Sequence, residues 1–367
     1  MPERIDGGTP AGPVAFHPTM SALGVPLSVL DLAPVAEGSS PAEALAVTAD
    51  YARTVEALGY RRYWVAEHHG MPGIASSAPP VLLAHVATAT ESIRLGSGGV
   101  MLPNHAPLVV AEQFGMLEAL HPGRIDLGLG RAPGTDPVTA HAIRRQRVDG
   151  PDEFPSQLAE LVGYFDGTIP ADHPFSRIEA TPAHGYRPEI WLLGSSDFSA
   201  TLAGRLGLPF SFAYHFAPAG LDTALAAYRA AFDPSDACPE PHVMLGVSVV
   251  CADTDEHARW LAAPGGLAFL RLREGRPGRY PTPEEAAARP LTPAEQAAVE
   301  GWTRSHVVGP PDAVASGLAE LVERTGVQEL MVSTMLPDPD ERTRSARLVA
   351  EATGLATART AAGAGPG

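Results

Sequence analysis

Short apolar runs alternate with longer stretches of helical periodicity along most of this chain. Strands buried in a parallel sheet are apolar on both faces, whereas amphipathic helices repeat their apolar residues every three or four positions. The short runs predict eight strands, over residues 27–32, 62–67, 93–100, 124–130, 189–193, 210–213, 243–252 and 328–334.

The stretches around these strands predict helices. Helical periodicity covers about 41–58, 78–90, 106–120, 152–165, 197–206, 221–232, 311–325 and 340–353. The first helix has the clearest start, because Ser40, Pro41 and Glu43 form the pattern of a capping box with proline in the first turn.

Eight successive strands with intervening helices predict one parallel (β/α)8 barrel, the TIM-barrel architecture of the α/β class. An open doubly wound sheet is the alternative. It is disfavoured because such sheets usually carry a glycine fingerprint after the first strand, and none follows Leu32.

The composition of four segments predicts the domain boundaries. Residues 1–22 are rich in proline and glycine, so we expect a disordered N-terminal extension, followed by a single barrel domain over 23–356. Residues 357–367 are rich in alanine and glycine and predict a flexible tail. Residues 264–301, after the seventh strand, contain many prolines, arginines and alanines, and we expect this insertion to be a lid over the C-terminal face.

Charge and residue usage exclude several functions. The chain has 26 Lys+Arg against 42 Asp+Glu, a net charge of −16, so nucleic acid and membrane partners are not expected. It contains no lysine, which excludes Schiff-base chemistry and a P-loop. Cys238 and Cys251 match no metal-binding spacing and indicate a reduced, cytoplasmic protein.

Unusual polar and glycine residues cluster where the predicted strands end. Enzymes with this barrel place their chemistry at the C-terminal ends of the strands. The groups found there are Glu67-His68-His69, Gly96-Ser97-Gly98-Gly99, Gly130-Arg131, Gly194-Ser195-Ser196 and Tyr214-His215.

Two of these groups each have a structural and a functional interpretation. Glu67, His68 and His69 could form a structural histidine pair or a zinc site, but adjacent strand residues point to opposite faces, so no metal is expected. Gly98 and Gly99 within a strand indicate a bulge or a flat ligand lying close to the backbone.

Two further groups also leave alternatives open. The segment from Gly194 to Ser199 could bind an anion at a helix N-terminus, or Ser196 or Asp197 could simply cap the helix. Arg131, at the mouth of the barrel, could pair with a cofactor oxygen or with an acidic neighbour.

Four long segments together resemble the bacterial luciferase-like flavin monooxygenase family: RYWVAEHHG, IRLGSGGVMLP, HPGRIDLGLGRAPGTD and WLLGSSDFSATLAGRLGLPF. The resemblance extends from about residue 23 to 354 and is closer to the alkanal-monooxygenase branch, of the kind found in actinobacterial polyketide tailoring. It implies an enzyme that uses reduced FMN and dioxygen to form a flavin C4a-hydroperoxide and to insert one oxygen atom into an organic substrate.

The resemblance also implies roles for individual residues. His68 matches the catalytic histidine beside the flavin. Gly98 and Gly99 match a non-prolyl cis peptide against the flavin ring. The remaining cofactor-binding residues implied are Arg131, Ser195, Ser196 and Ser199, around the phosphate.

The resemblance further implies partners. A separate NAD(P)H:flavin reductase is expected to supply FMNH2, because the chain has no dinucleotide fingerprint of its own. A homodimer is expected through the small and aliphatic residues of 78–89. Two alternatives remain open: an oxidoreductase dependent on the deazaflavin F420, and a non-catalytic flavin-binding relative.

Overall fold

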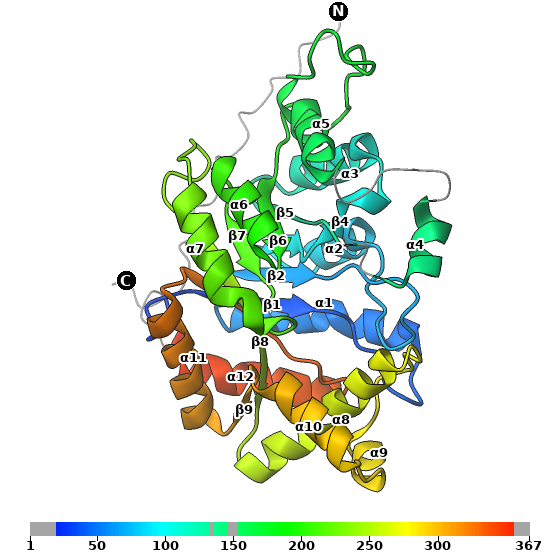
Figure 1. Cartoon of the computed structure of the whole chain (residues 1–367), viewed down its shortest axis with the longest axis vertical. Coiled ribbons are helices and arrows are strands. Elements are labelled where there is room, and N and C mark those ends of the chain that lie inside the picture. The colour runs from blue at the N-terminus through cyan, green and yellow to red at the C-terminus, as the bar shows by residue number, and fades with distance from the viewer. Residues whose placement is uncertain (1–19, 133–134, 145–152, 356–367) are drawn as a thin grey trace, which may run out of the picture.

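The predicted (β/α)8 barrel is confirmed. The computed structural model describes residues 20–132, 135–144 and 153–355. Its parallel strands close into a ring because β10 pairs with both β8 and β1 (Figure 1). In ring order the strands are β1 (Leu27–Asp31), β2 (Arg62–Val65), β3 (Arg94–Ser97), β5 (Ile125–Gly130), β6 (Glu189–Gly194), β7 (Phe210–Phe212), β8 (Val243–Cys251) and β10 (Glu329–Ser333).

Two short strands extend the ring. β4 (Val100–Met101) continues from β3 and pairs with β5, so the predicted strand over 93–100 is divided in two at Gly98 and Gly99. β9 (Val307–Gly309) pairs with the C-terminal half of β8 and was not predicted, because three residues are too few to show a period.

The helices surround the ring and follow the predicted pattern (Figure 1). The capping box at the start of α1 forms, with the Ser40 side chain accepting from the Glu43 N–H and the Glu43 carboxylate accepting from the Ser40 N–H at 2.7 Å. α4 (Pro137–Arg144) was not predicted. The other helices of the ring are α1 (Pro41–Ala57), α2 (Pro79–Ala87), α3 (Pro107–Leu120), α5 (Phe154–Asp166), α6 (Asp197–Arg205), α7 (Leu221–Ala231), α11 (Pro311–Thr325) and α12 (Pro339–Ala352).

The insertion after β8 is helical and starts later than expected. The expected boundary at 264 falls inside α8 (Asp255–Arg273), which continues through Pro264. Proline inside a helix removes one backbone hydrogen bond. Burial of Pro264 and the two glycines that follow it offsets the cost of this loss. The insertion therefore follows Arg273 and holds α9 (Pro283–Ala288) and α10 (Pro293–Thr303).

The expected N-terminal boundary also needs correction, because the chain joins the fold before residue 23. The Ser21 hydroxyl donates to the Val25 carbonyl at 2.5 Å, and the Ala22 N–H donates to the Thr353 carbonyl at 2.7 Å. Residues 1–19 and 356–367, which include most of the expected extension and the whole expected tail, lie outside the described residues.

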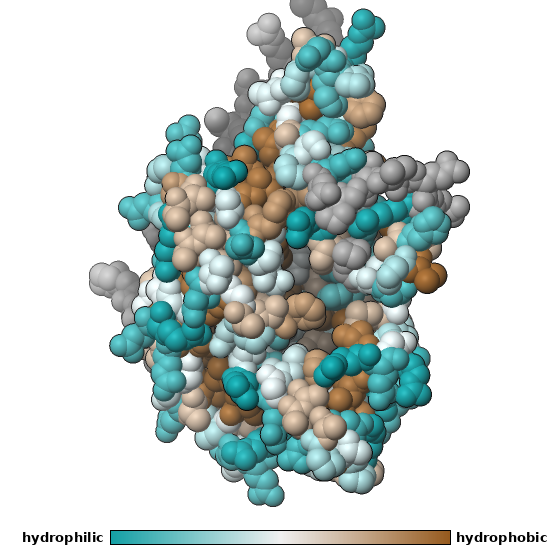
Figure 2. All heavy atoms as spheres, viewed as in Figure 1, coloured by the Kyte–Doolittle hydropathy of each residue, from teal (hydrophilic) through white to brown (hydrophobic). Residues whose placement is uncertain are grey.

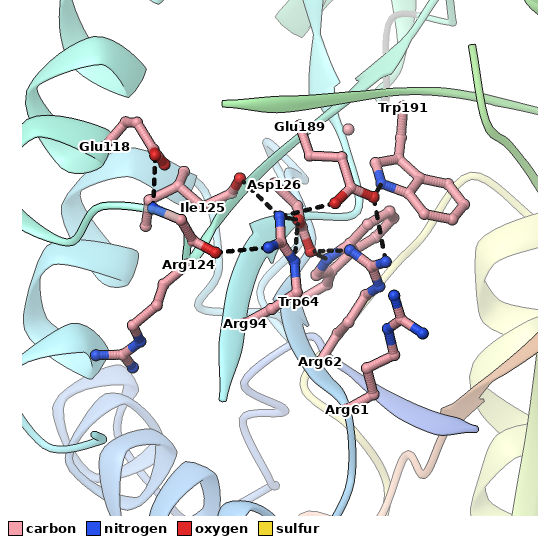
Figure 3. Close-up of polar contacts among 12 residues, drawn as sticks. Arg61, Arg62, Trp64, Arg94, Glu118, Arg124, Ile125, Asp126, Glu189 and Trp191 are labelled. Carbon is pink, nitrogen blue, oxygen red and sulfur yellow. Dashed lines mark hydrogen bonds and ion pairs between the residues drawn. The ribbon is translucent and has the colours of Figure 1, made fainter. Parts of the chain in front are cut away.

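A buried network of charges closes the N-terminal end of the barrel. Arg62 lies 2.8 Å from Asp126 and 3.1 Å from Glu189, and Arg94 lies 2.9 Å from Glu189 (Figure 3). Arg62 also lies 3.1 Å from Glu329. Each of these residues is the first or second of its strand. They form a charged floor, which we define as Arg62, Arg94, Asp126, Glu189 and Glu329.

An apolar layer covers this floor. Trp64 and Trp191 pack edge to face with ring centroids 5.5 Å apart, and Met244 and Met331 are buried with them. The two indole N–H groups donate down to the floor, to Asp126 and Glu189, each at 2.8 Å. The interior is therefore filled up to the level where the strands end, and only the C-terminal face is available for a site.

The outer surface is mixed in character. In Figure 2 hydrophilic side chains separate the apolar groups on the face shown. Of the helices that the structure describes, none is long and apolar enough to cross a membrane.

Candidate functional site

His68 lies at the C-terminal end of β2, where it was expected. Inward-facing side chains alternate from Arg62 to Trp64 and Ala66. His68, beyond the end of the strand, is a neighbour of His215, which follows β7, and so lies at the mouth of the barrel. Its backbone N–H donates to the Ser76 carbonyl at 3.0 Å, and its side chain is half-buried.

Glu67 and His69 belong to a separate cluster beside His68. The Glu67 carboxylate accepts the Met101 N–H at 3.1 Å and lies 2.9 Å from His69 Nε2 and 2.8 Å from His105 Nε2. Burial opposes ionisation of Glu67, but the hydrogen bonds from His105 and His69 outweigh it and lower its pKa to about 2. Glu67 thus anchors the ends of β2 and β4 to each other.

The two histidines of the pair have different surroundings. Glu67 is engaged by His69 and His105, while His68 lies on the opposite side of the chain. Within residues 20–132, 135–144 and 153–355, no cluster of three or more His, Cys, Asp or Glu side chains is arranged to hold a metal ion. The role of His105 could not be seen in the sequence, because nothing local links it to Glu67.

Gly98 and Gly99 are joined by a cis peptide bond, at the position that the resemblance implied. There is no space for a side chain at either residue. A Cβ on Gly98 would lie 2.6 Å from a methyl group of Leu30, and a Cβ on Gly99 would lie 2.7 Å from the Gly128 carbonyl oxygen. The backbone itself therefore forms this part of the mouth.

The N-terminus of α6 is open. Ser196 occupies the N-cap position, but its side chain makes no capping hydrogen bond, so the simple capping interpretation is not observed. Ser199, in the first turn of the helix, is buried, and its Oγ would lie 2.8 Å from a Cβ on Gly194. The first-turn N–H groups of a helix have no partner within the helix and attract anions.

Arg131 lies close to this helix end. Its guanidinium stacks over the ring of Phe198, 4.2 Å from the centroid, and this contact brings the end of β5 against the first turn of α6. The structure therefore brings Arg131 together with Ser195, Ser196 and Ser199, which were predicted as one group.

Two more histidines lie at the same end of the barrel. The His215 ring, just after β7, packs on β8, where its Nδ1 would lie 2.7 Å from a Cβ on Gly246. His306 precedes β9, and its ring lies 4.4 Å from that of Trp302, edge to face. His215 was noted only as a strand end, and His306 was missed because it lies far along the chain, beside the insertion.

The environment lowers the pKa of both of these histidines. Burial lowers the pKa of His215, and the neighbouring His68 lowers it further. Burial also lowers the pKa of His306 to about 4, with His215 as the second cause. His68, His215 and His306 thus form a series of neighbours across the mouth, contributed by β2, β7 and the segment before β9.

Comparison with known proteins identifies the family. The family model described as luciferase-like monooxygenase matches residues 25–329, and the chain belongs to this family. A luciferase-like monooxygenase of Escherichia coli K12 is 45% identical over 324 residues, which cover 88% of this chain and 96% of the relative. An N-acetyl-S-alkylcysteine monooxygenase of Bacillus subtilis is 34% identical over 329 residues, 89% of this chain and 97% of the relative.

Solved structures agree with the family. The crystal structure of apo-MsnO8 is 39% identical with a TM-score of 0.82, covering 90% of this chain and 99% of that one. The fold is shared at lower identity by the oxygenating constituent of a Pseudomonas putida 3,6-diketocamphane monooxygenase in complex with FMN (20%, TM-score 0.66, 90% of this chain and 97% of that one). It is also shared by an F420-dependent secondary alcohol dehydrogenase (14%, TM-score 0.63, 90% and 99%).

Proposed function

We propose that this protein is a reduced-flavin-dependent monooxygenase that binds FMNH2, uses O2 as co-substrate and inserts one oxygen atom into a small organic substrate. The reaction would be a hydroxylation, an epoxidation or a Baeyer–Villiger oxidation, in secondary-metabolite tailoring such as that of polyketides. A separate NAD(P)H:flavin reductase supplies the reduced cofactor. The observation that supports this most is that His68, the glycine pair and the open end of α6 lie at one end of a barrel that belongs to a monooxygenase family.

The residues present fit FMN. A phosphate suits the first turn of α6, where Ser195, Ser196 and Ser199 offer hydroxyl groups and Arg131 offers a guanidinium. A flat ring is placed against the backbone at the cis peptide between Gly98 and Gly99, where glycines within a strand permit a close approach. When bound, reduced FMN supplies the electrons that activate dioxygen.

The protein's own residues have three tasks in this reaction. The filled interior and the walls of the mouth exclude water from the reacting atoms. The α6 end and Arg131 orient the cofactor. His68 holds or moves a proton beside the substrate, since its imidazole can exchange a proton near neutral pH.

Isotope incorporation tests this proposal. The protein, FMN, NADH and a general flavin reductase are incubated under 18O2 with decanal, cyclohexanone and a dialkyl thioether. One 18O atom in any product supports the proposal. Hydride transfer with reduced F420 and no 18O incorporation would replace it with the deazaflavin reaction, and FMN binding without any product would indicate a non-catalytic relative.

A second copy of this chain is a further part of the proposal. Val81 on α2 and Val109 and Met116 on α3 are exposed, with Val81 71% exposed. α2 and α3 pack side by side, so these apolar side chains lie on adjoining helices. Exposed apolar side chains gathered on neighbouring helices favour association into a symmetric dimer.

A further inference from the structure

A pocket of about 550 Å³ lies between the C-terminal end of α8 and the insertion that follows it. Its walls come from residue 37 in the loop after β1, from residues 267–274 at the end of α8, and from residues 276–289 of the insertion. α8 and α9 pack against each other at one edge of the molecule, away from α6 (Figure 1). Small-molecule sites have volumes of about 300–1,000 Å³, so this pocket has the size of a ligand site.

The lining of this pocket is positively charged, although the protein as a whole is acidic. The charged residues that line it are Arg271, Arg276, Arg279, Arg289, Glu37 and Glu274. Four positive charges against two negative ones leave +2, whereas the whole chain carries −16. Guanidinium groups gathered in a pocket attract anions and form paired hydrogen bonds with carboxylate and phosphate groups.

Two of these arginines have donors available for a ligand. Arg271 lies 3.9 Å from Glu285, which is longer than a hydrogen bond. Arg279 donates from Nη1 to the Ser39 carbonyl, and this bond uses one of the five N–H groups of its guanidinium. Arg271 and Arg279 are therefore the residues that a bound anion would contact.

The other two arginines are paired with carboxylates. Arg276 lies 2.6 Å from Glu274, and Arg289 lies 2.6 Å from Glu295. The side chain of Arg276 is 77% exposed, so solvent screens its pair and leaves it replaceable. These two residues add to the positive charge at the rim of the pocket.

One wall of the pocket is apolar. Leu267 and Leu270 are three positions apart on α8, and Arg271 comes four positions after Leu267, so the three side chains lie on one face of the helix. A bare inorganic ion would leave this wall without a partner. An anion with an apolar body would contact the wall and the guanidinium groups together.

We infer that this pocket binds a small organic anion, which carries a carboxylate or phosphate group on an apolar body. The anionic group lies between Arg271 and Arg279, and the apolar body packs on Leu267 and Leu270. Arg279 and the adjacent Tyr280 are hydrogen-bonded to the loop after β1, so the bound anion connects α8 to that loop through the insertion. None of the residues proposed to hold the flavin lines this pocket, which makes it a second binding site.

Four small compounds test this inference. 3-Phenylpropionate carries a carboxylate on an apolar body, phenyl phosphate carries a phosphate, 3-phenyl-1-propanol is uncharged, and acetate lacks the apolar body. Calorimetry measures their binding to the full chain, with and without FMN. We expect 3-phenylpropionate to bind about tenfold more tightly than the alcohol, the scale of a hydrogen bond between charged groups. It should also bind more tightly than acetate, and added salt should weaken it.

Variants show whether the arginines cause this preference. Arg271→Gln should lower the affinity for 3-phenylpropionate about tenfold, because the carboxylate loses a charged donor. Arg276→Glu should lower it as well, and the exposure of this side chain keeps the variant folded. Arg259→Gln, on the exposed start of α8, is the matched control and should bind as the unmodified protein does. Circular dichroism checks the fold of each variant.

Hydrogen exchange shows where the compound binds. The Glu37 and Tyr280 N–H groups form hydrogen bonds between the loop after β1 and the insertion. Both should exchange more slowly with 3-phenylpropionate bound, because the ligand opposes the opening that breaks these bonds. The N–H groups in the first turn of α6, where we place the flavin phosphate, should exchange as before.

The outcomes separate this inference from the proposed function. It is overturned if neither anion binds more tightly than the alcohol, if acetate binds as tightly as the better of the two anions, or if Arg271→Gln and Arg276→Glu both keep full affinity. Protection at α6 in place of the pocket would also overturn it. Tighter binding of phenyl phosphate than of 3-phenylpropionate supports the site and assigns it a phosphate ligand. No measurement here needs an oxygenated product, so either proposal can fail without the other.

Discussion

At the scale of single residues, the proposed site assigns chemistry and cofactor binding to different residues. His68 lies in the loop after β2, whereas Arg131, Ser196 and Ser199 belong to the end of β5 and the start of α6. Different elements hold the two groups in place. Replacing one group should therefore leave the other in position.

His68→Ala should lower product formation by about a hundredfold or more, the usual effect of losing a positioned acid or base. FMN affinity should remain within a few-fold, and hydrogen peroxide should be released in place of oxygenated product. Product and peroxide are quantified together, with His257→Ala as the control. Full oxygenation by His68→Ala would contradict the role given to this residue.

Ser196→Ala should show the reverse pattern. Loss of one hydrogen bond to a charged group should weaken FMN binding by about 1 kcal/mol or more, with the oxygenation rate retained at saturating FMN. Fluorescence titration with FMN measures the change, and Ser156→Ala on α5 is the matched control. An unchanged FMN dissociation constant would exclude Ser196 from the phosphate site.

At the scale of elements, the insertion after α8 is the part that the sequence pattern described least well. Its two helices begin with capping boxes, Thr282 with Glu285 and Thr292 with Glu295, in which both reciprocal hydrogen bonds form. The same pattern predicted α1 correctly from Ser40 and Glu43. These two helices could therefore have been predicted, and the many prolines obscured them although each lies in a first turn.

The insertion is also attached to the barrel mouth. The Tyr280 N–H donates to the Val35 carbonyl at 2.8 Å, the Glu37 N–H donates to the Tyr280 carbonyl at 2.9 Å, and Arg279 donates to the Ser39 carbonyl. The loop that follows β1 thus pairs with the insertion. If the insertion opens and closes as a lid, these few bonds must break and re-form.

Limited proteolysis tests the lid. Trypsin can cut only after arginine in this lysine-free chain, and Arg276 and Arg289 each precede a proline that blocks cleavage. We expect the first cuts after Arg273 and Arg279, and protection when FMN and a substrate are added, because closure removes the open state that proteases attack. Equal cleavage rates with and without ligands would remove the lid.

The sequence pattern predicted the strands of the ring well, but it predicted only part of the arrangement at the mouth of the barrel. Runs such as 27–32 and 243–252 are apolar on both faces, and this feature needs no knowledge of their neighbours. His68 and the glycine pair could be found because each lies within a local motif. The pairing of Glu67 with His105 and the approach of His306 to His215 arise only when distant segments are folded together, so no local pattern shows them.

At the scale of the whole molecule, the charged floor links the two halves of the barrel. Glu329 on the last strand of the ring contacts Arg62 on β2, and Arg62 contacts Asp126 on β5. Removing one member of a buried ionic network leaves its partners uncompensated, at a cost of about 3–5 kcal/mol. The floor therefore stabilises the closure of the ring.

Acid should lower the free energy of unfolding of the protein by protonating a carboxylate of the charged floor. Burial opposes ionisation of Glu329, but Arg62 and the other partners lower its pKa from 4.5 to about 2. A lowered carboxylate pKa stabilises the fold above the unfolded-state value, and this contribution is lost as the pH falls from 4.5 towards 2. Glu329→Gln should lower the free energy of unfolding at pH 7 and flatten its decrease over that acid range.

Urea unfolding at a series of pH values measures both effects. Glu300→Gln, on the exposed side of α10, is the control that removes a carboxylate without touching the floor. If the free energy of unfolding of Glu329→Gln decreased with acid as steeply as that of the unmodified protein, the charged floor would not be the cause of the decrease.

The proposed dimer makes its own prediction. Met116→Asp places a charge on the exposed apolar face of α3, where Met116 is 52% exposed, and should convert a dimer into a monomer because an interface core excludes unpaired charge. Analytical ultracentrifugation at micromolar concentration measures the change. Sedimentation of the unmodified protein as a monomer would contradict the dimer.

The charged floor has a consequence for the order in which cofactor, substrate and product enter and leave the barrel. Arg62, Glu329 and the two tryptophans above them fill the N-terminal end of the barrel, so ligands can enter only at the C-terminal end. Whatever reaches His68 arrives and departs by the same route. If the cofactor lies against the glycine pair and the organic molecule lies above it, loading is sequential, and the last molecule to enter is the first to leave. Product then departs before the flavin, and oxidised FMN has to leave through the same opening before the reductase can supply the next FMNH2.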